Sequence, residues 1–267
     1  LFIAYLVCGV PVLLGFVVPL IQLSIWASIT SDSIMTADFA GYLFNSLTLA
    51  AITSAAALIL ALFIAYGRRL YPTQLSSVAA RVLSLGYGLP GTVVAIGVLV
   101  PFAWLDNRVS AFMVARFDFN TGLLLSGTAF ILVFAYLVRF LPIAMNTVDA
   151  GLTKVRPSMD EAGRSMGLGP MTILRRVHMP IMRGSLATAL LLVFVDVLKE
   201  LPATLLLRPF NFNTLAIRTY ELANEERLAD AAGPALTIVL ASLIPVIRLS
   251  RSLERAKDVP SVGEKPR

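Results

Sequence analysis

Long apolar runs separated by short polar segments dominate this sequence. Six runs have roughly the twenty residues that an α-helix needs to cross the ~30 Å hydrocarbon layer of a bilayer. They cover residues 2–29, 41–66, 84–104, 121–145, 186–207 and 231–247. Because a chain in lipid must satisfy its backbone hydrogen bonds internally, each run predicts a helix. The pattern therefore predicts an all-α integral membrane protein with six transmembrane helices.

The composition supports this fold class. Hydrophobic residues make up 57% of the chain and charged residues 14%, and the mean hydropathy is +0.81. A soluble protein of this size would need more polar surface. The net charge of +6 would suggest nucleic-acid binding in a soluble protein. Here the basic residues concentrate in particular loops, so membrane topology explains the charge and no nucleic-acid partner is expected.

The basic residues alternate between loops along the chain. Lys and Arg number three in residues 67–83, six in 146–183 and six in 246–267. They number none in 30–40, two in 105–120 and three in 208–230. Since cytoplasmic loops carry the excess of Lys and Arg, the first set is predicted to lie in the cytoplasm. The amino end and a polar, basic tail at 251–267 are then also cytoplasmic.

Residues 146–183 form a polar, basic interruption between apolar runs and predict a helix-turn-helix. Pro157 suits the first turn of a helix, which glycines at 167 and 169 would end. Pro170 would open a second short helix that stops at Pro180. Helical spacing places four residues on one face of the first helix, namely Met159, Ala162, Gly163 and Met166. Small residues on an exposed face would let another protein approach closely, with Glu161 at the rim.

The spacing within this segment resembles the EAA loop of the membrane-spanning subunits of ABC importers. Glu161-Ala162-Gly163 is followed by three residues and Gly167, and then by nine residues, Val177, one residue and Met179-Pro180. The departure is Gly163, where that family usually has alanine. The resemblance implies a loop that couples to a separate ATPase through Asp160, Glu161, Ala162, Gly163, Gly167 and Pro180. Alternatively, it is an ordinary cytoplasmic loop held by lipid headgroups.

A narrower resemblance comes from residues outside this loop. Segments 89–92, 195–210 and 214–223 are similar to ferric-iron ABC permeases of the binding-protein-dependent kind. That implies one permease domain at 1–250, forming the carboxy-terminal half of a fused two-domain protein in the bacterial inner membrane. Its expected partners are an ABC ATPase dimer, a second permease domain and a periplasmic or lipid-anchored solute-binding protein. A free subunit that pairs with itself is the alternative, and thiamine, polyamine, sulfate or phosphonate are alternative solutes.

The first run carries no basic segment before it and no small-residue cleavage site, so a signal peptide is not expected. The chain begins at Leu1 rather than at an initiator methionine, and we expect it to be a piece of something longer.

Charged residues in the fifth run are candidates for a translocation path. Asp196, Lys199 and Glu200 would face protein or water, because a charge in the bilayer centre is costly. Two acids facing one base predict a site of net negative character that could pass Fe³⁺, whereas a buried pair of Lys199 with one acid would only fix packing. Pro90 and Gly91 in the third run weaken a helix, which suits either close packing or a polar path.

The sequence argues against an enzyme. It has no Gly-rich phosphate-binding loop, one histidine, His178, and one cysteine, Cys8, so no nucleophilic set or metal site can be assembled. No cofactor is expected in this chain, and ATP with Mg²⁺ would bind the partner ATPase. A secondary transporter or channel that uses the intramembrane charges as an ion relay is the alternative function.

Overall fold

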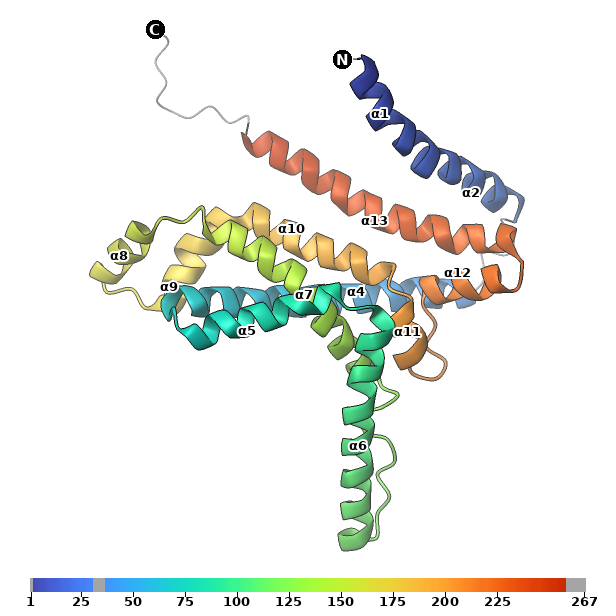
Figure 1. Cartoon of the computed structure of the whole chain (residues 1–267), viewed down its shortest axis with the longest axis horizontal. Helices are drawn as coiled ribbons and strands as arrows, with labels where there is room; N and C mark the ends of the chain where they lie inside the picture. Colours follow the sequence, from blue (N-terminus) through green and yellow to red (C-terminus); the bar gives the residue numbers. More distant parts are fainter. Residues whose placement is uncertain (1, 31–36, 258–267) are drawn as a thin grey trace.

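A computed structural model of the chain describes residues 2–30 and 37–257, which are mostly helical and contain no strand within those ranges (Figure 1). The helices are α1 Phe2–Val12, η1 Leu13–Val17, α2 Val18–Ile29, α4 Ala37–Leu70, α5 Gln74–Ser84, η2 Leu85–Gly88, α6 Gly91–Phe117, α7 Ala129–Leu152, α8 Pro157–Ser165, α9 Pro170–Ile173, η3 Leu174–His178, α10 Met179–Leu198, α11 Pro202–Leu207, α12 Leu215–Asn224 and α13 Leu228–Lys257.

The core of the molecule is the packing of three long helices, α4, α7 and α10. Small side chains line the contacts between them, and most are fully buried. They include Ala57, Ala61, Ala65, Ala144 and Ala189. Because lipid tails are as apolar as the core, helices in a membrane associate through such close van der Waals contact rather than by the hydrophobic effect.

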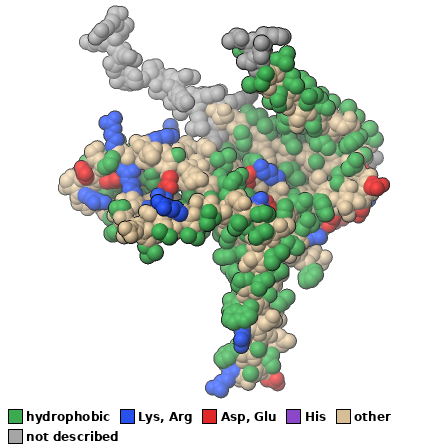
Figure 2. Space-filling view, viewed as in Figure 1, with side chains coloured by type: hydrophobic (Ala, Val, Ile, Leu, Met, Phe, Trp, Pro, Cys, Tyr) green, Lys and Arg blue, Asp and Glu red, His purple; other side chains and the backbone are tan. Residues whose placement is uncertain are grey.

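Six helical segments are long and apolar enough to cross a membrane, as the sequence predicts. They are Tyr5–Ile29, Asp38–Leu70, Gly91–Phe117, Ala129–Leu152, Pro170–Leu198 and Leu228–Ile247. Hydrophobic side chains cover much of the outer surface of the body and of α6 (Figure 2). Such a surface suits lipid or other membrane helices rather than water.

The third apolar segment differs most from its predicted bounds. Instead of one helix over 84–104, the chain forms η2, breaks at Leu89–Pro90, and starts α6 at Gly91. The helix α6 then lies crosswise to α4 and α10 and projects from the body (Figure 1). The break falls before Pro90, which disfavours helical backbone at Leu89, and Leu89 is extended. The 3-10 turn η2 packs closely on α7, since a β-carbon at Gly86 would overlap the carbonyl of Val138.

The fifth segment is also displaced from 186–207. Helical residues run from Pro170 to Leu198, so Pro180 does not end a helix as predicted. The π-helical turn η3 accommodates it, since Met179 N–H bonds to the carbonyl of Leu174 and the bonding pattern is shifted just before the proline. The helix ends at Leu198, and α11 restarts at Pro202.

The terminal helices form an outer layer. α13 packs against α2, α12 and α10, and it runs on to Lys257, so the first residues of the predicted tail at 251–267 are helical. The rest of that tail lies outside the described residues.

Candidate functional site

The EAA-like loop has the predicted helix-turn-helix form. α8 begins at Pro157, with Arg156 in extended conformation before it, and ends at Ser165. Gly167 has φ +74°, a left-handed conformation that L side chains rarely adopt, and its N–H bonds to the carbonyl of Arg164. Pro170 opens α9 after an extended Gly169. The turn therefore depends on a glycine at 167.

One side of this loop is free surface. Glu161 and Ala162 are exposed, as is Pro180 at the start of α10. Three methionines contribute apolar area beside them, namely Met159, Met166 and Met171, with exposed fractions of 38%, 71% and 45%. Lys and Arg side chains surround the same end of the molecule, where α8 lies in Figure 1 (Figure 2). Flexible methionines within a polar, basic rim suit contact with another protein.

Two of the residues named for the coupling loop face inward, and one of them, Gly163, was predicted to lie on the outer face. Gly163 is buried, and a β-carbon there would lie 2.9 Å from the Ile173 side chain of α9. Asp160 points toward the membrane helices, where Oδ1 lies 2.5 Å from His178 Nε2 and Oδ2 lies 2.8 Å from Arg69 Nε. The predicted face of small residues is therefore split, because Gly163 closes the α8–α9 contact and Ala162 remains outside.

The carboxylate of Asp160 is electrostatically stabilised. Burial opposes its ionisation, but the hydrogen bonds from His178 and Arg69 outweigh burial and hold the pKa of Asp160 below its ordinary value. His178 is fully buried, and because a carboxylate only accepts, we assign the imidazole hydrogen to Nε2. Asp160 is thus an ionised group that joins two elements of the fold.

A second candidate site is a charged cavity of about 490 Å³ where α7, α10 and α11 meet η2. Its lining residues are Tyr87, Arg139, Phe140, Asp196, Lys199, Glu200 and Pro202. The structure brings together the predicted path residues Asp196, Lys199 and Glu200, and it adds Arg139, which the sequence analysis missed. Arg139 is the one charged residue of the apolar run 121–145, and that isolation was the available signal.

The cavity is charge-balanced, which corrects the expectation of an excess negative charge. Arg139 Nη1 lies 3.2 Å from Glu200 Oε1, and Lys199 Nζ lies 2.8 Å from Asp196 Oδ1. Glu200 also accepts from the Ala203 N–H at 3.2 Å. Two acids therefore face two bases, and Glu200 is the more buried of the two acids.

Gly91 permits the Arg139–Glu200 pair. A β-carbon at Gly91 would overlap Arg139 Nη1 and lie 2.5 Å from Glu200 Oε1. Pro90 favours extended backbone at the preceding Leu89, and α6 then begins at Gly91 with its first turn against these charges. The sequence left open whether Gly91 serves close packing or lines a polar path. In the structure the two roles are compatible, because close packing brings its backbone against the charged cavity.

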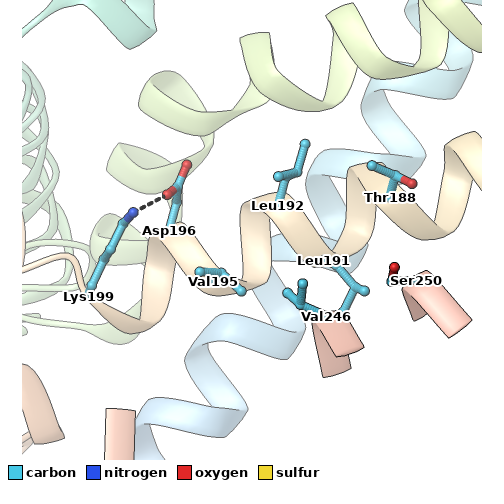
Figure 3. A pocket seen from close by; sticks show the side chains of 8 residues that line it. All are labelled: Thr188, Leu191, Leu192, Val195, Asp196, Lys199, Val246 and Ser250. Carbon is cyan, nitrogen blue, oxygen red and sulfur yellow. Dashed lines mark ion pairs between the residues drawn. The ribbon is translucent and has the colours of Figure 1, made fainter. Parts of the chain in front are cut away.

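A less polar cavity of about 400 Å³ lies between α10 and α13, next to the Asp196–Lys199 pair (Figure 3). Lys199 extends from the end of α10 toward Asp196, while leucine and valine side chains, with Thr188 and Ser250, line the remainder (Figure 3). Within the described residues, no three His, Cys, Asp or Glu side chains gather as a metal site. The four charged side chains that line these two cavities are instead held in the Asp196–Lys199 and Arg139–Glu200 ion pairs.

The sequence matches the family described as binding-protein-dependent transport system inner membrane component over residues 57–255. This range includes both the EAA-like loop and the charged cavity. The chain belongs to this family. This is a family of transport permeases, which is the class that the loop spacing predicts.

Two relatives illustrate the range of this permease family. The chain is 28% identical over 90% of its length to the Fe(3+)-transport system permease protein FbpB 2 of Haemophilus influenzae, of which it covers 45%. It is 25% identical over 80% of its length to the putative 2-aminoethylphosphonate transport system permease protein PhnV of Salmonella typhimurium, of which it covers 74%. The chain thus spans about half the length of the FbpB 2 relative.

Solved ABC transporters have the same permease fold. A chain of a bacterial alginate ABC transporter, in complex with an alginate pentasaccharide-bound periplasmic protein, aligns with a TM-score of 0.74 at 16% identity, covering 97% of this chain and 96% of that one. The inward-facing MetNI methionine ABC transporter aligns with a TM-score of 0.58 at 14% identity, covering 83% and 99%. These likenesses support the fold assignment.

Proposed function

We propose that this chain is one permease half of an ATP-driven importer and that its EAA-like loop docks on a separate ABC ATPase dimer. The two-sidedness of the loop carries the proposal. Glu161, Ala162 and the three exposed methionines lie on the outer side, while Asp160 and Gly163 attach the other side to the bundle. A surface held this firmly can receive a push from a partner and pass it on.

The remaining partners follow from this role. A second permease domain, fused or separate, would complete the path, and a periplasmic or lipid-anchored binding protein would deliver the solute. ATP and Mg²⁺ would bind the ATPase. The fifteen-to-five excess of Lys and Arg supports a cytoplasmic EAA-like loop and a cytoplasmic amino end in the inner membrane. The likeness to FbpB 2 over 45% of that protein supports the carboxy-terminal half of a fused permease.

The proposed solute is ferric iron, which the FbpB 2 relative supports. Asp196, Lys199 and Glu200, with Pro90 and Gly91, would border the path. The balanced charges and the lack of a three-ligand cluster among the described residues favour iron that moves with its oxyanion ligands over bare Fe³⁺. A phosphonate is the second candidate, because PhnV matches over 74% of its length and Arg139 and Lys199 suit an oxyanion.

Uptake in proteoliposomes tests the function and the solute together. The permease, with its second half, ATPase and binding protein, would be supplied with ferric citrate, ferric chloride or 2-aminoethylphosphonate, with and without ATP. We expect ATP-dependent uptake of ferric iron, strongest with the chelate. Uptake of phosphonate alone would reassign the solute, and solute flux without ATP would refute the importer.

The docking surface has its own test. Glu161→Lys reverses a charge at the exposed rim of the loop and should reduce co-purification of the ATPase at least about tenfold, a loss of about 1.4 kcal/mol of binding free energy. Glu225→Lys, an exposed acid beyond α12, is the matched control and should leave co-purification unchanged. Normal ATPase binding by Glu161→Lys would refute this docking face.

A further inference from the structure

Arg69, in the last turn of α4, makes the largest set of contacts described between α4 and the EAA-like loop region. Its Nε donates to Asp160 of α8 at 2.8 Å. Its two terminal nitrogens donate to the carbonyls of Leu152 and Val155, at 2.9 and 2.8 Å. The guanidinium therefore joins α4 to the end of α7 and to α8 at the same time, which a planar fork of donors can do and an ammonium cannot.

Two further side chains complete this cluster. His178 Nε2 lies 2.5 Å from the second oxygen of Asp160, and the Tyr66 hydroxyl donates to the carbonyl of Pro170 at 2.8 Å. The rings of Tyr66 and His178 meet edge to face, with centroids 5.1 Å apart. The side chains of Arg69, Asp160 and His178 are only 20%, 14% and 0% exposed, so water screens their interactions weakly. Tyr66 and Arg69 thus attach α4 to both helices of the loop.

The same helix is attached near its other end to the segment between α11 and α12. Asn45 Nδ2 donates to the carbonyl of Asn213 at 3.0 Å, and the Leu215 N–H donates to the Ser46 hydroxyl at 2.8 Å. From Ser46 to Arg69 the helix is about 35 Å long, at the ordinary rise of about 1.5 Å per residue. α11 begins at Pro202, which lines the charged cavity. One continuous helix therefore connects the loop to the segment that follows the cavity.

We infer that Arg69 is the positioning residue through which movement of the EAA-like loop is transferred to α4, and that α4 carries it to the segment after the cavity. This rests on the proposed function, since the movement comes from the ATPase. Asp160 then acts inward, as the contact by which α8 moves Arg69, rather than outward as part of the docking face. The structure assigns docking and transfer to opposite sides of α8.

The ratio of solute imported to ATP hydrolysed, measured in proteoliposomes of the complete transporter, tests this inference. Arg69→Gln and Asp160→Asn should each lower that ratio at least about fivefold while the ATPase still co-purifies and hydrolyses ATP. Arg68→Gln is the matched control, because its neighbouring guanidinium pairs with Asp149 of α7 at 3.0 Å, with about a third of each side chain exposed. That variant should stay within about twofold of wild type.

A distance measurement separates positioning from simple stability. Spin labels at exposed Asn211 and at exposed Ala111 of α6 would report whether ATP binding moves the segment after α11. We expect a nucleotide-dependent change in wild type and its loss in Arg69→Gln with ATP still bound. A wild-type transport ratio, or a preserved distance change, in Arg69→Gln would overturn the inference.

A second variant and the wild-type assay distinguish failure of the transfer role from misfolding and from failure of the proposed function. If Arg69→Gln does not assemble, Arg69→Lys decides, because lysine keeps the charge opposite Asp160 but cannot also reach both carbonyls. A ratio lowered at least about threefold would support the transfer role, and a wild-type ratio would refute it. Failure of the wild-type chain to bind an ATPase or to show ATP-driven uptake would refute the proposed function instead, whatever the Arg69 variants do.

Discussion

The ion pair between Arg139 and Glu200 gives the most demanding stability prediction. The side chain of Glu200 is 6% exposed and the side chain of Arg139 is 21% exposed. Replacing Arg139 with methionine would leave a buried carboxylate with the Ala203 N–H as its remaining partner in the described structure. Removing one member of a buried pair typically costs about 3–5 kcal/mol, most of it from the charge left behind.

Neutralising Glu200 as well should restore the lost stability. In the double variant Arg139→Met/Glu200→Gln no charge remains, and neutral replacement of a buried pair is often without cost, so stability should return to within about 1 kcal/mol of wild type. Lys199→Met is the matched control, because Lys199 is 63% exposed in its pair with Asp196. Exposed pairs contribute up to about 1 kcal/mol.

The free energies of unfolding would be measured by denaturant titration of the purified chains in mixed micelles, following loss of helix. Arg139→Met should be the least stable variant, and the double variant and Lys199→Met should have stabilities near that of wild type. If Arg139→Met costs no more than Lys199→Met, or if adding Glu200→Gln does not restore stability, the pair does not hold α7 to the α10–α11 break as described.

Three further predictions concern the EAA-like loop. The folded state favours ionised Asp160, whose pKa lies below its ordinary value of 3.8. Its contribution should therefore be constant near neutral pH and be lost as pH falls through that lowered pKa, so the thermal stabilities of wild type and Asp160→Asn should converge only below about pH 4. Gly163→Ala should be tolerated, because the end of the Ile173 side chain can shift, whereas Gly163→Leu should cost about 1–3 kcal/mol in thermal unfolding and loosen α8 from α9. In intact cells, a membrane-impermeant thiol reagent should label Glu225→Cys, and it should label Arg164→Cys only after permeabilisation. The reverse pattern would refute the proposed orientation.

Features encoded locally were predictable from the sequence. The bilayer fixes the length of an apolar run, so the number of spans followed from hydropathy alone. The helices of the EAA-like loop were also predictable, because Pro157 and Pro170 mark helix starts and Gly167 occupies the turn, where φ is +74°. The start of the fifth helix was misplaced because the π turn at Leu174–His178 carries the helix past Pro180. Its end was misplaced because the helix stops at Leu198 and a separate short helix begins at Pro202.

Contacts between distant residues were not predictable from one sequence. Arg139 pairs with Glu200 across 61 positions, and Arg69 with Asp160 across 91. Helical spacing placed Gly163 and Ala162 together, but it could not say which of them α9 would cover, because a short helix has no fixed inner face until its partner is placed. Arg139 therefore balances the charge of the cavity, and Arg69 holds Asp160 on the inner side of the loop, and neither contact could be read from local sequence.

The two sites share helix α7, which gives their separation a mechanical meaning. Arg139 lies on α7 beside the cavity, and the carbonyl of Leu152 at the end of the same helix accepts from Arg69. Thirteen residues of helix separate them, about 20 Å at the usual rise. A displacement of the EAA-like loop therefore acts on both α4 and α7, and the Arg139–Glu200 pair lies where α7 meets the break between α10 and α11. Because packed helices shift between discrete arrangements rather than bend continuously, the proposed importing cycle would either preserve that pair or exchange it for a contact with the solute.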